Sequence, residues 1–408
     1  MMNWGTLVPE GLGALRRQQD LGLAAAVRYF NDAAVPGLGA LWFPAPLVWS
    51  VLAVSLAEDA GRSALPIGNA IEALAMLQCA KESNPRLRGS RKLQNVEDVS
   101  FKNLSRRGVY VVQPFRMGMV QPLVALGFVH GSRYGAFRLA GAGQRMLNLP
   151  EVSRWRQALS AWVKGAKPGK DLAGLSPLAA LPQSVCKLIK ARTLEGAGAD
   201  DQAAARRRAL VQLGKGPSAS ALKSEEPLPG LTIEHWRDLR AGAALVELRD
   251  LGLEVLRGVE DVLRKRADDA LKPRIAPDEM PETVLARVSV LRARVEENLP
   301  RLESVGETDS LRYAQDCLNA PRDVILRLAE RDGSVICLRD GQLMPGPAAG
   351  DLRPDHASVN GDMITPAAQA EEFAPQLYRL RNLHCLMEEL VGRPNPASPD
   401  FPSRRASL

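Results

Sequence analysis

The chain has 408 residues, of which 46% are hydrophobic and 24% charged; this length exceeds what one hydrophobic core usually supports, and the composition excludes wholesale disorder. Aromatic residues make up only 5%, which favours helices packed through aliphatic side chains and predicts a mainly α fold with small β-hairpins. The five cysteines stand singly and the four histidines lack metal-binding spacing, so neither a disulfide framework nor a zinc site is indicated, and a reducing cytoplasm is the expected location.

The net charge of +7 is unevenly distributed along the chain. Residues 1–80 contain 4 lysine and arginine residues against 6 aspartate and glutamate residues, and residues 193–408 contain 29 against 35. Residues 81–192 contain 20 against 5, so the whole positive excess lies in this segment. Such a concentration attracts polyanions, with nucleic acid the usual partner, whereas a solvated basic face is the alternative.

Residues 1–64 are predicted to form an N-terminal helical segment, with helices over 12–30 and 47–60. The run from Ala33 to Ala57 contains no charged residue and is long enough to cross a bilayer. Prolines and glycines break its first half, and only Leu47–Ala57 remains uninterrupted. We therefore expect a loop followed by a buried core helix with Pro46 in its first turn, and we do not expect membrane attachment, which is the alternative for this run.

Residues 65–192 are predicted to form a basic module. A helix over 67–81 is followed by a polar loop, short helices over 99–107 and 116–127, a β-hairpin over 128–139 and a helix over 140–147. This order, and the stretch LVALGFVHGSRYGAFRLAGAGQRML, resemble the winged helix-turn-helix superfamily over residues 65–149. The resemblance implies that the helix near Arg116 lies in a major groove and that Arg133, Tyr134 and Arg138 of the wing reach flanking phosphates.

One feature departs from that resemblance. The supposed recognition helix offers only Arg116 and Gln121 as polar readers and contains Pro122, so a winged helix used for protein contacts stays open. The candidate phosphate or groove contacts are nine cations of the module: Arg86, Arg88, Arg91, Lys92, Arg106, Arg107, Arg116, Arg133 and Arg138.

Two further segments of the chain's middle can be interpreted in more than one way. Trp155 and Trp162 stand among basic residues, as in single-strand binders, but their spacing of seven residues is more often a helix face packed on a core. Residues 193–230 are rich in glycine, proline and serine and are predicted to be a linker, interrupted by a short exposed helix over 200–213.

Residues 231–391 are predicted to form a helical assembly module. Long amphipathic helices over 232–271 and 282–299 indicate an antiparallel hairpin that mediates self-association or binding to partner proteins. A helix over 321–331, a small β-hairpin near 334–344 around an Asp340-Gly341 turn, and a last helix over 367–391 follow. Residues 392–408 are expected to be a disordered tail.

No motif in the sequence indicates catalysis, a cofactor or a metal. The phosphate-binding loop pattern is absent, and the one cluster of potential ligands is Asp351, Asp355, His356 and Asp362 in a polar loop. The leading hypothesis is a non-catalytic nucleic-acid-binding subunit, with DNA favoured, of a larger bacterial complex. The alternatives are a scaffold subunit without nucleic-acid contact and an enzyme whose site is assembled from dispersed residues.

Overall fold

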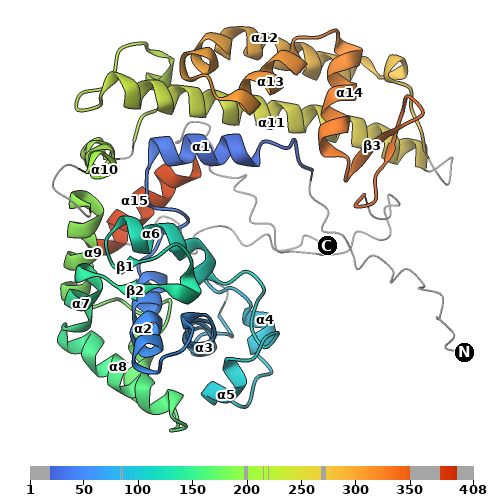
Figure 1. The fold of residues 1–408 in the computed structure, drawn as a ribbon. Helices are drawn as coiled ribbons and strands as arrows, with labels where there is room; N and C mark the ends of the chain where they lie inside the picture. Colours follow the sequence, from blue (N-terminus) through green and yellow to red (C-terminus); the bar gives the residue numbers. More distant parts are fainter. Residues whose placement is uncertain are drawn as a thin grey trace, which may run out of the picture. The chain divides into compact units, whose positions relative to one another are not determined.

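The computed structural model describes residues 19–82, 84, 86–196, 201–214, 216–218, 220–267, 273–349 and 377–392. Helices dominate these ranges, and the strands form two small antiparallel sheets of two strands each, which confirms the predicted fold class (Figure 1). The chain divides into two compact units. Unit 1 comprises Met1–Phe30, Ser218–Glu226 and Trp236–Leu377, and unit 2 comprises Asn31–Pro217, Pro227–His235 and Tyr378–Leu408.

The core of unit 2 is built around helix α2 (Ala45–Asp59) and helix α3 (Ala64–Leu77). Every residue from Ala45 to Ala57 is buried, and Pro46 lies in the first turn, as expected for the uncharged run. A helix that is apolar on all sides is stable only when all its sides are buried, and here the neighbouring helices bury them. No helix in the described ranges combines the length and apolar character needed to cross a bilayer.

The basic segment follows α3 as a series of short elements. These are α4 (Ser90–Leu93), α5 (Phe101–Leu104), η1 (Phe115–Met119), α6 (Val120–Ala125), β1 (Val129–His130), η2 (Tyr134–Ala136), β2 (Arg138–Leu139) and α7 (Gly141–Leu147). The predicted hairpin is confirmed, with Val129 opposite Leu139 in an antiparallel pair. The helix expected over 116–127 is instead a 3-10 turn followed by the six residues of α6.

The remaining helices of unit 2 are α8 (Pro150–Val163), α9 (Gln183–Glu195), α10 (Gln202–Gln212) and α15 (Tyr378–Leu390), with the 3-10 turn η3 (Lys170–Leu175) after α8. The sequence predicted the helix α10 but placed it in an exposed position, and this was wrong. Ala204, Arg207, Ala209 and Leu210 are buried, because α10 packs against α9 and α15. The Arg207 guanidinium donates to the carbonyls of Thr193 and Pro36, each at 2.7 Å.

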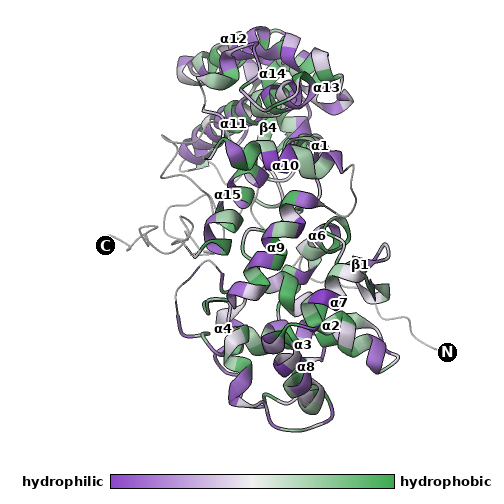
Figure 2. Ribbon diagram, turned by 90° about the vertical axis from the view of Figure 1, so that its left-hand side faces the viewer, coloured by the Kyte–Doolittle hydropathy of each residue, from purple (hydrophilic) through white to green (hydrophobic). Residues whose placement is uncertain are grey.

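Unit 1 is organised along the long helix α11 (Ile233–Ala267), most of which lies in this unit. Helix α12 (Glu282–Val305) runs antiparallel to it: Arg294 Nε lies 3.4 Å from a Glu247 carboxylate oxygen, and Arg287 donates to the Glu254 carbonyl at 2.8 Å. The predicted helical hairpin is therefore present. Both hydrophilic and hydrophobic residues occur on these helices in Figure 2, in keeping with their amphipathic pattern.

The other elements of unit 1 are the first part of α1 (Ala24–Ala34), η4 (Ala221–Lys223), η5 (Pro277–Glu279), α13 (Thr308–Cys317), α14 (Pro321–Asp332), β3 (Ile336–Arg339) and β4 (Gln342–Pro345). The expected hairpin of β3 and β4 is confirmed, and Asp340 (φ 51°) and Gly341 (φ 73°) both adopt the left-handed conformation of its tight turn. Helix α1 starts later than expected, because Gly22 (φ 68°) donates to the Asp20 carboxylate in a turn.

Candidate nucleic-acid interface

A buried carboxylate organises the basic segment. Glu72 on α3 is 1% exposed and accepts hydrogen bonds from the Tyr110 hydroxyl at 3.0 Å, the Phe115 amide at 2.7 Å and the Arg116 amide at 3.1 Å. Burial raises the pKa of Glu72, although these hydrogen bonds and the Arg116 charge act in the opposite direction. The chain from residue 110 to 116 is therefore anchored at three points on one carboxylate.

A second loop is fixed against the first. Gly89 has a φ of 71°, and a Cβ atom there would lie 2.3 Å from a side-chain methyl of Val111, so only glycine fits. The Lys92 ammonium donates to the carbonyls of Gly108 at 3.0 Å and Tyr110 at 3.4 Å. Residues 86–93 and 105–113 thus form one continuous surface, which we call the two-loop surface.

Five cations of the two-loop surface are exposed. They are Arg88, Arg91, Lys92, Arg106 and Arg107. None of them forms an ion pair within the described ranges, and Arg91, Arg106 and Arg107 make no side-chain hydrogen bond there either. The Arg88 guanidinium lies over the Phe115 ring, 4.0 Å from its centroid, and desolvation lowers its pKa. A guanidinium remains charged under such a perturbation, so the positive potential of the surface persists.

Arg86 does not share this exposure. Its guanidinium donates to both carboxylate oxygens of Glu389 on α15, at 3.1 and 2.6 Å, and to the Pro177 carbonyl at 3.0 Å. The side chain is 12% exposed and lies near the rings of Trp42 and Phe43. Arg86 therefore ties α15 to the core of unit 2.

The polar side chains of the supposed recognition helix also form contacts within the protein. The Arg116 guanidinium lies over the Tyr134 ring, 5.8 Å from its centroid, and its Nε is buried. Gln121 donates to the Asp32 carboxylate at 2.7 Å. Neither side chain is free to read bases in this conformation, and the winged-helix resemblance stays a prediction.

Arg133 and Arg138 are exposed and belong to the β1–β2 hairpin. The Leu139 amide donates to the Glu58 carboxylate at 2.8 Å, which joins the hairpin to the end of α2. In both overall views α2 and α3 lie between this hairpin and α4 (Figures 1 and 2). The nine predicted contacts therefore divide into five on the two-loop surface, two on the hairpin and two with partly buried side chains.

The two tryptophans of α8 belong to the core. Trp155 is 7% exposed and Trp162 is 0% exposed; Trp162 stacks edge-on against Phe101 and donates to the Val99 carbonyl at 3.0 Å. The packing interpretation of their spacing is thus confirmed. Sequence reasoning overlooked Glu72, although a single carboxylate within the apolar run from Ile67 to Met76 was a usable signal.

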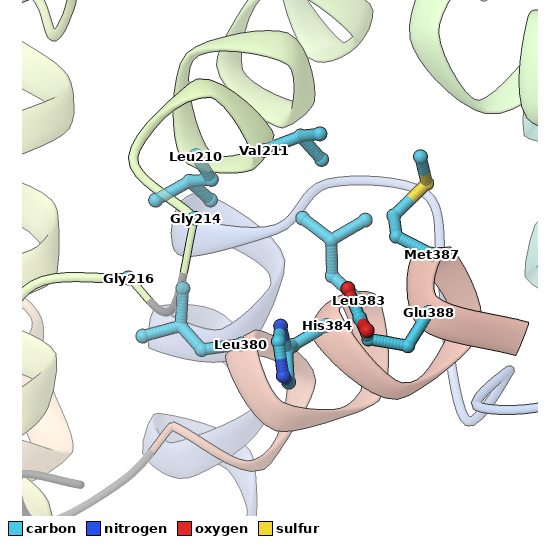
Figure 3. A pocket seen from close by; sticks show the side chains of 9 residues that line it. All are labelled: Leu210, Val211, Gly214, Gly216, Leu380, Leu383, His384, Met387 and Glu388. Atoms are coloured by element: carbon cyan, nitrogen blue, oxygen red, sulfur yellow. The ribbon is translucent and has the colours of Figure 1, made fainter. Parts of the chain in front are cut away.

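A separate cavity of about 330 Å³ lies between α10 and α15 in unit 2 (Figure 3). Its wall is mostly aliphatic, and His384 and Glu388 supply the polar side chains from one face of α15. Within the described ranges no group of three or more His, Cys, Asp or Glu side chains is placed to hold a metal ion. The loop cluster of Asp351, Asp355, His356 and Asp362 lies outside those ranges.

The two-loop surface is the part of unit 2 with the clearest chemical character, because it combines concentrated charge with a fixed backbone. Comparisons with protein-family models, with curated proteins and with solved structures each found no match for the chain.

Proposed function

We propose that this protein is a non-catalytic nucleic-acid-binding subunit, with DNA the favoured ligand, and that the two-loop surface makes its phosphate contacts. The observation that carries the proposal is a group of five exposed cations that form no ion pair within the described ranges. They lie on two segments that Lys92 and Gly89 join to each other, and Glu72 anchors one of these segments. Phosphate contacts of this kind release condensed counterions, which makes them favourable at low salt.

The hydrogen bonds that hold two of these side chains support the assignment over a merely solvated basic face. Lys92 uses two of its donors on carbonyls, and Arg88 donates to the Gln113 carbonyl at 3.4 Å. Holding these side chains costs conformational entropy during folding, which reduces the cost of ordering them when a ligand binds. The α11–α12 hairpin would supply the assembly contacts of a larger complex.

The experiment is a fluorescence-anisotropy titration of labelled DNA across a salt series. The triple variant Arg91→Gln, Arg106→Gln, Arg107→Gln should bind more weakly, and its log Kd against log salt should lose a slope of about 2.7, at about 0.9 for each lost contact. A matched double variant, Lys187→Gln with Arg208→Gln, removes exposed cations from α9 and α10 and should leave binding close to wild type.

A second double variant, Arg133→Gln with Arg138→Gln, tests the wing that the resemblance implies. Loss of slope in this variant but not in the triple variant would move the interface to the hairpin. No binding at low salt, together with a salt-resistant complex with an acidic protein, would contradict the proposal and favour the scaffold alternative, in which the same cations face a protein.

A further inference from the structure

The aromatic side chains in the two-loop surface and directly beneath it point toward the interior of unit 2. Tyr110, the only aromatic residue within the two loops, is 2% exposed and bonded to Glu72. Phe115 is 3% exposed, beneath Arg88, and Phe101 packs against Trp162. Binding of single strands depends largely on stacking of bases on exposed aromatic rings. The two-loop surface presents no ring for that purpose.

An aliphatic side chain projects from the same surface instead. Val112 is 87% exposed, the highest value among the large hydrophobic side chains in the described ranges. Its neighbour Val111 is turned inward against Gly89, and the next residue, Gln113, is held through its carbonyl by Arg88. The tip that carries Val112 is therefore fixed in the outward position.

We propose that the ligand of this surface is double-stranded nucleic acid, and that Val112 enters a groove while the flanking cations contact the phosphates on either side. This rests on the proposed function and adds the class of nucleic acid to it. Charge complementarity identifies the occupant. Arg88 and Lys92 donate to the carbonyls of Gln113 and Tyr110, which flank Val112 in the chain, so cations accompany the apolar tip as phosphate strands accompany the floor of a groove. An aliphatic side chain can lie against that floor or wedge into a base step from the groove side, and a single strand has no groove from which to do either.

An anionic membrane is the rival occupant of an apolar tip among cations. Membrane anchoring needs a larger apolar face than one valine provides, since affinity scales with buried apolar area. A groove needs only a narrow projection. The shape of the tip therefore favours duplex nucleic acid over a lipid surface.

The test compares a labelled duplex of about two helical turns with each of its separate strands, using the full-length protein. We expect the duplex to bind about tenfold more tightly than either strand. Val112→Ala should weaken duplex binding about threefold to tenfold without changing the salt slope, because an apolar contact releases no counterions. Val290→Ala, on α12 at 51% exposed, is the matched control and should bind like wild type.

The outcomes separate the two proposals. Equal or tighter binding of single strands, or full affinity in Val112→Ala, overturns the duplex assignment while nucleic-acid binding stands. Binding to neither form overturns the proposed function as well. A third arm uses vesicles of phosphatidylserine and phosphatidylcholine: binding that depends on Val112 would assign the tip to membranes and overturn the inference, and absence of such binding supports the groove.

Discussion

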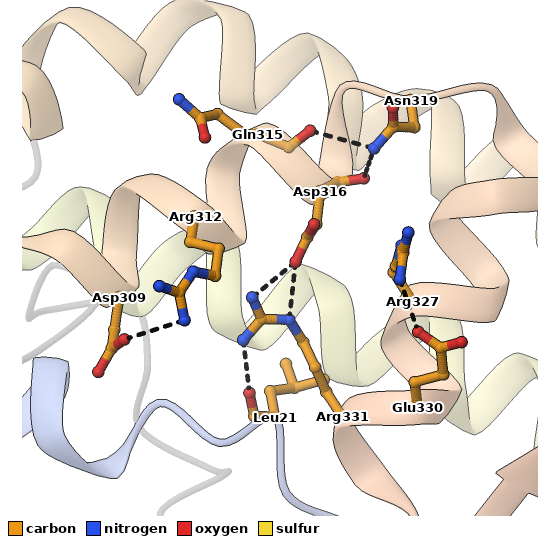
Figure 4. Close-up of polar contacts among 9 residues, drawn as sticks. All are labelled: Leu21, Asp309, Arg312, Gln315, Asp316, Asn319, Arg327, Glu330 and Arg331. Atoms are coloured by element: carbon orange, nitrogen blue, oxygen red, sulfur yellow. Dashed lines mark hydrogen bonds and ion pairs between the residues drawn. The ribbon is translucent and has the colours of Figure 1, made fainter.

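The two units differ in how their arginines are paired with carboxylates. In unit 1 many arginines are paired with nearby carboxylates, as Arg331 is with Asp316 at 2.6 Å and Arg327 is with Glu330 at 3.0 Å (Figure 4). In unit 2 the exposed cations of the two-loop surface have no such partner in the described ranges. Arginine charge that is neutralised internally contributes to the fold, whereas unpaired charge is available to a ligand.

The cause of this difference lies in composition. Residues 193–408 contain 35 acidic residues for 29 basic ones, so a helical arginine often finds a carboxylate within one turn. Residues 81–192 contain 5 acidic residues for 20 basic ones. Asp98, one of the five, already accepts the Ser100 amide at 2.9 Å. Neutralisation within this segment is therefore impossible for most of its cations.

The largest expected effect concerns the anchor of unit 2. Glu72→Ala removes the acceptor of three hydrogen bonds and leaves buried donors unsatisfied, which should lower the free energy of unfolding by about 3 kcal/mol or more. Urea unfolding measures this. The control Glu97→Ala changes an exposed carboxylate and should stay within about 0.5 kcal/mol of wild type.

The same side chain gives unit 2 a pH dependence. Because burial raises the folded pKa of Glu72 above its ordinary 4.5, its contribution to stability is full below that value and declines as pH rises through the folded pKa. Glu72→Gln cannot titrate. The stability advantage of wild type over Glu72→Gln should therefore shrink from acidic toward neutral pH, and a constant difference would contradict the assignment.

The next largest effect tests the paired arginines of unit 1. Arg331 is 18% exposed, donates twice to Asp316 and once to the Leu21 carbonyl, and lies over the Tyr313 ring. Arg331→Ala should cost about 2 kcal/mol in thermal or urea unfolding. Arg312, 67% exposed and 4.0 Å from Asp309, is the matched control, and Arg312→Ala should cost less than about 0.5 kcal/mol.

A comparable effect concerns the junction of the two loops. Gly89→Ala introduces both a strained positive φ and a clash with Val111, and should cost about 2 kcal/mol. Gly108→Ala, at φ 91° with open space around it, bears the strain alone and should cost about 1 kcal/mol. Equal losses in the two variants would show that the contact with Val111 does not hold the loops together.

The smallest effect sharpens the comparison of the units. Arg106→Gln with Arg107→Gln should change the free energy of unfolding by less than about 0.5 kcal/mol, since neither side chain has a partner to lose among the described residues. The same variant should lose nucleic-acid affinity at low salt. A large loss of stability would mean that these arginines serve the fold, as Arg331 does in unit 1.

Much of the secondary structure could be predicted from local patterns. The α11–α12 hairpin follows from apolar residues three and four apart, and the β3–β4 turn follows from Asp340 and Gly341, because each pattern acts over a few residues. The burial of α10 could not be predicted, because its packing partner α15 lies more than 160 residues away in the sequence. The role of Arg86 was missed for the same reason, because its partner Glu389 lies 303 residues away.

Composition and spacing alone established a mainly α chain with one strongly basic segment and two small hairpins, because these properties depend on residue type and local periodicity. Only the tertiary structure decided which basic residues are exposed. Glu72 accepts hydrogen bonds from backbone amides more than 30 residues away, and Glu389 forms an ion pair with Arg86, which lies far from it in the sequence. Such long-range pairings depend on how helices pack. They therefore determine which arginines are bonded within the fold and leave the five cations of the two-loop surface exposed.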